Sequence, residues 1–167
     1  MKNWKLSAKL SVLVVLSVVG FVISIAFGLM ELRSSLLEDR KLKTKHVVEV
    51  ARGIVAGFHA SQVEGRLTPE EAQKAAIGAV RALRYGEGEY FFINDMNSTS
   101  VMHPIKPELE GKDLSGLADP DGKKLFAEFT RVVRDHGAGF VDYKWPKPGK
   151  ADPVMKISYV EGFKPWG

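Results

Sequence analysis

The sequence predicts an α+β domain that follows an N-terminal transmembrane helix, with a long helix packed on an antiparallel sheet. Three observations lead to this fold class. Residues 10–30 contain no charged side chain, and a helical pattern continues from there to about residue 64. The rest of the chain has short aromatic and β-branched segments set apart from helical ones. Segregated strands and helices of this kind are typical of antiparallel α+β domains.

The apolar run has the length of a transmembrane helix, because about 20 apolar residues cross a hydrocarbon core of about 30 Å. Lys2, Lys5 and Lys9 precede the run, and the positive-inside rule therefore places them in the cytoplasm. A cleaved signal peptide is disfavoured, because its apolar region is shorter and ends at small residues that are missing after Met30. We predict a cytoplasmic N-terminus at 1–9, a transmembrane helix at 10–30 and an extracytoplasmic sensor domain at 31–167.

The segment after the apolar run is expected to continue as one amphipathic helix. It contains no proline as far as residue 64. Its apolar residues recur at steps of three and four. They include Val47, Val50, Ile54 and Phe58. Such a stripe can pack against a sheet, against a second subunit, or against both.

A second, shorter helix is predicted to begin at Thr68 and to run to about Arg84. Thr68 is a suitable N-cap, Pro69 suits the first helical position and Glu71 completes a capping box. Its small apolar residues form a face suited to close packing. They are Ala72, Ala75, Ala76, Ala79 and Val80.

Four strands and a third helix complete the predicted domain. The strands are expected at 89–94, 100–103, 139–145 and 154–163. The third helix is expected to start at Asp119–Pro120 and to end at Gly137. Its predicted buried stripe is Leu125, Phe126, Phe129, Val132 and Val133. We expect the long helix to cover one sheet face, and the loops and the short helix to cover the other and leave a pocket there.

The composition argues against several classes of function. The chain has no cysteine, which excludes disulfides, thiolate metal sites and cysteine nucleophiles. Its formal net charge is +4 with acidic and basic residues interleaved, so no basic stripe marks a nucleic-acid partner. Asp119 and Asp121 begin a calcium-like loop, but Lys123 stands where an oxygen ligand is required. Because no catalytic motif occurs either, we predict no enzymatic activity, no metal and no cofactor.

Side chains with binding chemistry are spread over the four predicted strands. They comprise the aromatic residues of 90–92 and 143–145, with His103, Lys156 and Tyr159. An ammonium group, an imidazole, hydroxyls and apolar walls together suit a small carboxylate with a short tail. Taken singly, such aromatic residues are more often core, and a strand lysine more often lies at a solvated edge. Strand alternation puts Tyr90 and Phe92 on one face and Phe91 on the other, so only one of these faces can line a pocket.

Several segments, in order and spacing, resemble the single Cache domain of bacterial chemoreceptors. The segments are YFFIND at 90–95, MHP at 102–104, LEGKDL at 109–114, DPDGK at 119–123, GFVDYKWPKPG at 139–149 and KISY at 156–159. The resemblance covers roughly residue 31 to the last residue. It implies a PAS-like antiparallel sheet in the sensor region of a methyl-accepting chemotaxis protein of the bacterial inner membrane. The implied ligand is a small organic acid, sensed in the periplasm or outside the cell. The set of Lys156, His103 and aromatic residues itself suggests a carboxylate of two to four carbons.

The resemblance also implies site residues and partners. His103 and Lys156 match motif positions expected to contact the anion. The expected wall and hydroxyl contacts are Tyr90, Phe92, Tyr143, Trp145 and Tyr159. A homodimer is expected. Members of the family continue with a last sheet strand, a second membrane helix and a cytoplasmic signalling region, so we expect the sheet of this chain to be one strand short.

Two alternatives to a chemotaxis receptor stay open. The same sensor module can belong to a histidine kinase or a cyclase, or the chain can be a membrane-anchored fragment that does not signal. Cytoplasmic signalling partners would be reached only through the region that follows the sensor domain. The sequence does not identify the ligand.

Overall fold

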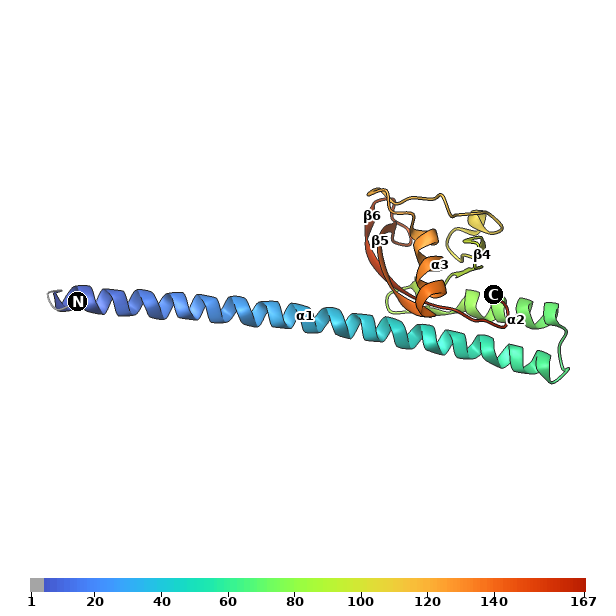
Figure 1. Cartoon of the computed structure of the whole chain (residues 1–167), viewed down its shortest axis with the longest axis horizontal. Coiled ribbons are helices and arrows are strands. Elements are labelled where there is room, and N and C mark those ends of the chain that lie inside the picture. Colours follow the sequence, from blue (N-terminus) through green and yellow to red (C-terminus); the bar gives the residue numbers. More distant parts are fainter. Residues whose placement is uncertain (1–4) are drawn as a thin grey trace. The chain divides into compact units, whose positions relative to one another are not determined.

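A computed structural model describes residues 5–167, so Lys2 and the rest of residues 1–4 lie outside the described part of the predicted cytoplasmic N-terminus. The chain divides into two compact units, Met1–Arg40 and Lys41–Gly167. Helix α1 (Leu6–Val63) contributes to both units. The uninterrupted helix expected after the apolar run is therefore confirmed (Figure 1).

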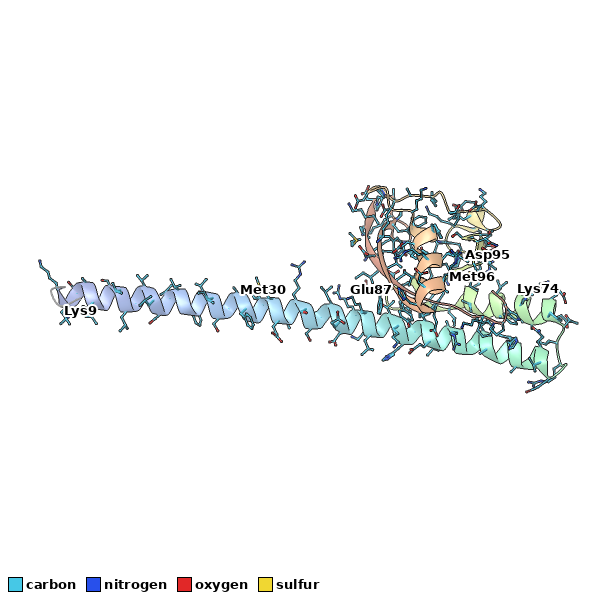
Figure 2. All side chains as sticks on the ribbon, in the orientation of Figure 1. Lys9, Met30, Lys74, Glu87, Asp95 and Met96 are labelled. Atoms are coloured by element: carbon cyan, nitrogen blue, oxygen red, sulfur yellow. The ribbon has the colours of Figure 1, made fainter. Side chains whose placement is uncertain are left out.

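Residues 10–30 of α1, in the first unit, form an apolar helix whose side chains project in every direction, as Figure 2 shows around Met30. Leu13, Phe21 and Phe27 are 64%, 68% and 69% exposed within the structure. Within residues 5–167, α1 is the helix that is long and apolar enough to cross a membrane. An apolar surface all round a helix is what contact with lipid requires.

In the second unit, the end of α1 runs alongside α2 (Pro69–Ala82), as Figure 1 shows. The predicted capping box is confirmed: the Glu71 N–H donates to Thr68 Oγ1 at 3.2 Å, and the Thr68 N–H donates to Glu71 Oε2 at 2.8 Å. On the predicted small-residue face, Ala72, Ala76 and Val80 are buried. The C-cap Leu83 is extended, so α2 ends before Arg84.

The strands form three antiparallel pairs in place of one continuous sheet. They are β1 (Arg84–Tyr85) with β2 (Glu89–Tyr90), β3 (Ile93–Asn94) with β4 (Ser100–Met102), and β5 (Ala138–Pro146) with β6 (Pro153–Glu161). The strand predicted at 89–94 is thus broken, and the β1–β2 hairpin was not anticipated. The turn between β3 and β4 is held by Asp95, whose Oδ1 accepts the backbone N–H groups of Asn97 and Thr99, each at 2.8 Å. A short 3₁₀ helix, η1 (Pro107–Leu109), follows β4.

Helix α3 (Leu125–His136) begins later than predicted, and the predicted start at Asp119–Pro120 is wrong. The Asp119 carboxylate explains the delay. Its Oδ1 accepts the backbone N–H groups of Asp121 at 2.9 Å and Lys123 at 3.0 Å, which closes a turn. Gly122 has a φ of 84°, outside the helical region. The side chain therefore takes the backbone donors that a helix would have used.

Helix α3 packs closely on the β5–β6 pair, as Figure 1 shows. A Cβ atom on Gly139 of β5 would lie 2.6 Å from Val132 Cγ1, and one on Gly162 would lie 2.7 Å from Val133 Cγ1. Only glycine allows this approach. The hydrophobic core forms at this interface from residues of α3, β5 and β6 with Leu114. The helix on this sheet face is thus α3, and the expectation that α2 would cover it is wrong.

A wide cavity separates β3 from β6. Its volume is about 340 Å³. It is lined by residues of α1 between 44 and 55, by α2, and by residues 90–96 and 158–163. Among residues 5–167, β3 pairs only with β4 and β6 only with β5. The expectation that the sheet is one strand short stays a prediction, and these two open edges are what favours it.

Candidate functional site

A second, small cavity lies where α3 faces β5. Its volume is about 10 Å³, roughly the room of a single water molecule. The lining residues are Tyr90, Phe92, His103, Leu125, Phe126, Phe129, Tyr143 and Trp145. Five of the seven site residues predicted from the sequence therefore surround one cavity.

The aromatic rings around the cavity form one continuous box. The His103 ring centre lies 5.1 Å from that of Tyr90 and 6.3 Å from that of Trp145. The Phe129 ring centre lies 5.3 Å from that of Phe92 and 5.2 Å from that of Tyr143. Edge and tilted ring contacts at these distances are favourable, so contacts between its lining rings stabilise the box.

Strand alternation correctly grouped Tyr90 with Phe92, and the structure shows which face lines the small cavity. Phe91 points away from that cavity and packs on Tyr85, with ring centres 5.2 Å apart. Sequence reasoning assigned Phe126 and Phe129 to the core without connecting them to the site. Their spacing of three on α3 was the available signal, because it puts both rings on the buried helix face.

His103 is a neutral hydrogen-bond donor in this box. It is 3% exposed, and burial lowers its pKa to about 4. The Lys106 backbone N–H donates to its Nδ1 at 3.0 Å. With Nδ1 acting as an acceptor, the proton of the neutral ring is on Nε2. His103 can therefore offer an N–H group to a ligand without adding a charge.

An ion pair between α2 and the segment after β4 fixes the backbone of His103. The His103 N–H donates to Glu110 Oε1 at 2.8 Å. Arg81 of α2 holds the same carboxylate with both guanidinium nitrogens, at 2.7 and 2.9 Å. These bonds, the Arg81 contact first, lower the pKa of Glu110. Sequence reasoning missed this pair because its members are far apart in the chain and carry no local motif.

The tyrosines of the site keep their protons. Burial raises the pKa of Tyr143 and of Tyr90. The Tyr143 hydroxyl shares a hydrogen bond of 2.8 Å with Ser158 Oγ on β6. Both rings therefore present hydroxyl groups, which can donate to a carboxylate.

Lys156 lies at the edge of the box. It pairs with Tyr143 in the register of β5 and β6, so the two side chains share a sheet face. Its Nζ atom is 3.0 Å from Glu89 Oε2 and 5.2 Å from the centre of the Tyr90 ring. A second cation, Lys106, places its Nζ atom 4.6 Å from the centre of the Trp145 ring. Glu89 and Lys106 were not singled out from the sequence.

Tyr159 is the predicted site residue that the structure does not bring to the box. On β6 it alternates with Ser158, whose hydroxyl meets Tyr143, so its ring lies on the other sheet face. There it packs on Phe140, with ring centres 4.9 Å apart. We leave Tyr159 out of the candidate site.

The described residues contain no cluster of three or more His, Asp or Glu side chains that could hold a metal ion. Donors come from His103, Tyr90 and the ammonium group of Lys156, and apolar walls come from α3. With its walls moved apart, this arrangement can hold an anion that has a short apolar tail.

Comparison with protein families matches residues 36–167 to Single Cache domain 2. A methyl-accepting chemotaxis protein of Pseudomonas putida, McpP, is 40% identical over 167 residues, which is 100% of this chain and 31% of that protein. The sensor histidine kinase MctS of Rhizobium johnstonii is 34% identical over 98 residues, which is 58% of this chain and 21% of the kinase. The chain thus spans about a third or less of the length of these relatives.

Two solved structures have the same fold. One is described as a periplasmic sensor domain of a chemotaxis protein, with 51% identity and a TM-score of 0.77 over 78% of this chain and 91% of that one. The other is described as the structural basis for carboxylic acid recognition by a Cache chemosensory domain. It has 44% identity and a TM-score of 0.77 over 80% of this chain and 91% of that one.

Proposed function

Because the chain belongs to the Single Cache domain 2 family, we propose that residues 41–167 bind a carboxylate of two to four carbons outside the cytoplasm. The chain would then be the ligand-sensing part of a chemotaxis receptor in the inner membrane. Its relatives include sensor domains of chemotaxis proteins, one of which is described as recognising carboxylic acids. Signalling output would come from sequence outside these 167 residues.

One observation carries the proposal: the Lys156 ammonium group lies 5.2 Å from the centre of the Tyr90 ring, and that ring lies 5.1 Å from the neutral imidazole donor of His103. The Lys156 side chain is 13% exposed, so its charge is costly without an anionic partner, and Glu89 is that partner in this structure. A ligand carboxylate can take a charge-assisted hydrogen bond from Lys156 and a neutral one from His103. The Phe126 and Phe129 rings would cover its tail.

The volume of the small cavity limits the class of ligand. At about 10 Å³ it has room for roughly one water, so even acetate requires its walls to move. Short acids need the smallest movement, and each added methylene needs more. We therefore expect affinity to fall sharply for acids longer than four carbons.

The test is a panel of acids added to the purified full chain in nanodiscs, followed by thermal unfolding. Acetate, propionate and butyrate are compared with propionamide, a neutral analogue of propionate. A ligand at about 100 times its dissociation constant stabilises a protein by about 2.7 kcal/mol, which gives a clear rise in Tm. No rise with any of the acids would refute the proposal.

The Lys156→Met variant tests the assigned contact. A hydrogen bond to a charged group contributes about 1.5–3 kcal/mol, so we expect affinity for the acid to fall by roughly 10- to 100-fold. Lys150→Met is the matched control, because Lys150 is exposed in the turn between β5 and β6. Equal affinity in the two variants, measured by calorimetry, would remove Lys156 from the site.

The likeness to the kinase MctS favours one alternative, in which this sensor module controls a histidine kinase. The sensing chemistry would be the same, and only the output would differ. Sequencing the gene beyond codon 167 separates the two, because a kinase domain and a chemotaxis signalling region have different sequences. Absence of ligand binding would favour a membrane-anchored protein that does not sense.

A further inference from the structure

The carboxylate that holds Lys156 comes from the domain itself. Glu89 Oε2 lies 3.0 Å from Lys156 Nζ, and the Glu89 side chain is 34% exposed. Lys156 is far less exposed, at 13%. The cation is thus part of the site, and its partner reaches in from a hairpin at the rim.

That hairpin is a small and separate element. Strands β1 and β2 have two residues each, and the turn between them contains Gly86 and Gly88 with φ of 54° and 98°. Within the turn, the Gly88 N–H donates to the Tyr85 carbonyl at 3.2 Å. The hairpin starts directly after α2, two residues beyond Ala82. A hairpin with so few backbone pairs can move at low cost.

We propose that Glu89 is a built-in competitor for the ligand and that it sets the affinity of the site for carboxylates. Lys156 has one ammonium group, and two carboxylates on it would repel each other at close range. An incoming acid must therefore displace Glu89 or weaken its ion pair. This inference rests on the proposed binding of a carboxylate at Lys156, and it adds a residue that lowers affinity instead of raising it.

The same displacement would report binding to the rest of the domain. Release of Glu89 frees β2, which carries the adjacent wall residue Tyr90. It also frees the hairpin from β6, because Lys156 holds it there through Glu89. The hairpin directly follows α2 in the chain. Arg81 of α2 holds the Glu110 carboxylate, which accepts the backbone N–H of His103. Glu89 thus links occupancy of the anion site to the position of α2.

The decisive experiment measures the affinity of Glu89→Gln for propionate by calorimetry on the full chain in nanodiscs. The amide keeps the shape of the side chain and removes the competing charge. An ion pair of this exposure corresponds to roughly a five-fold change in a binding constant, so we expect about five-fold tighter binding of propionate. Affinity for propionamide should change less, because that ligand does not compete for charge.

Glu87→Gln is the matched control. Glu87 is exposed in the turn of the same hairpin, where Figure 2 labels it, and its substitution changes the net charge equally. Tighter propionate binding in Glu89→Gln alone supports the inference. Unchanged affinity, weaker affinity, or equal gains in both variants would overturn it, while measurable binding by the unaltered chain would leave the proposed function standing.

A second variant tests whether loss of the Glu89 carboxylate unfolds the domain. Glu89→Ala also removes the charge, and its Tm without ligand shows whether the domain stays folded. If this variant is folded and binds propionate no more tightly than the unaltered chain, the inference is wrong. If neither the unaltered chain nor either Glu89 variant binds any of the acids, the proposed function fails as well.

Discussion

Among single residues, His103 has the most distinctive environment. Its pKa is lowered to about 4 by burial, whereas an unfolded histidine titrates near about 6.5. Between these values the unfolded chain binds more protons than the folded one, so stability rises with pH. The stability that the buried, neutral His103 contributes is complete above about pH 6.5 and is lost as the pH falls through about 4.

This predicts a specific loss of stability in acid. We expect the Tm of the unaltered chain to fall more steeply between about pH 7 and about pH 4 than that of His103→Asn, which cannot titrate there. His136→Asn is the control, because His136 is exposed at the end of α3. Parallel curves for the unaltered chain and His103→Asn would contradict the neutral, buried state of His103. Thermal unfolding at a series of pH values makes the comparison.

At the same scale, sequence reasoning singled out more of the residues around the small cavity than of the residues that hold them. Strand alternation paired Tyr90 with Phe92, and the family resemblance singled out His103 and Lys156. The carboxylates that hold these two residues, Glu110 and Glu89, were missed. Glu110 binds Arg81 and Glu89 binds Lys156, and in both pairs the two residues are far apart in the sequence. These contacts therefore depend on tertiary packing.

Among the elements, the part of α1 in the second unit leaves one face open. Val50 is 66% exposed although it belongs to the predicted stripe. Gly53 and Gly57 follow it on the same face, and a Cβ added to either would meet no atom within 4 Å apart from the backbone of its own helix turn. An exposed valine beside small residues suits close contact with a second helix. We propose that a second copy of this chain covers this face.

The chain has no cysteine, so single-cysteine variants can test this homodimer. We expect Val50→Cys to form a disulfide-linked dimer in membranes under mild oxidation, because symmetric helices bring equivalent positions together. Ala51→Cys is the control, since Ala51 is the next residue and is buried at 6% exposure. Similar dimer yields from both variants on non-reducing gels would argue against this face.

Elements with a strong local signal were predicted well. The capping box at Thr68 started α2 where expected, and Gly137 ended α3 where expected. The start of α3 was missed because the Asp119 carboxylate closes a turn that the Asp–Pro pattern does not distinguish from a helix start. The break between β2 and β3 has no marker in the sequence, since the aromatic run continues through it.

For the whole molecule, the sheet is divided, and β3 and β6 each have an unpaired edge among residues 5–167. β3 and β6 face each other across a cavity of about 340 Å³. Within residues 5–167, both polar side-chain atoms of Asn94 on β3 are buried without a hydrogen-bond partner. A further extended strand in this cavity would offer both edges a hydrogen-bonding partner. Only the family resemblance predicted the missing strand. The open edges depend on how the strands are arranged in space, and the sequences of the strands do not reveal that arrangement.

The orientation of the chain in the membrane is the last prediction. Lys2, Lys5 and Lys9 precede the apolar run, so we expect the N-terminus in the cytoplasm and the sensor domain outside. A membrane-impermeant maleimide added to intact spheroplasts should label Asp152→Cys, in the exposed turn between β5 and β6. It should label Lys5→Cys only after lysis.

Labelling of both variants after lysis shows that each thiol is reactive. The reverse pattern in intact spheroplasts would put the aromatic box in the cytoplasm, where it would sample internal metabolites. The expected pattern puts Lys156 and Glu89, the proposed competitor of the ligand, on the side where external acids arrive. Helix α1, the described helix long and apolar enough to cross the membrane, is one route by which binding at that box can be reported inward.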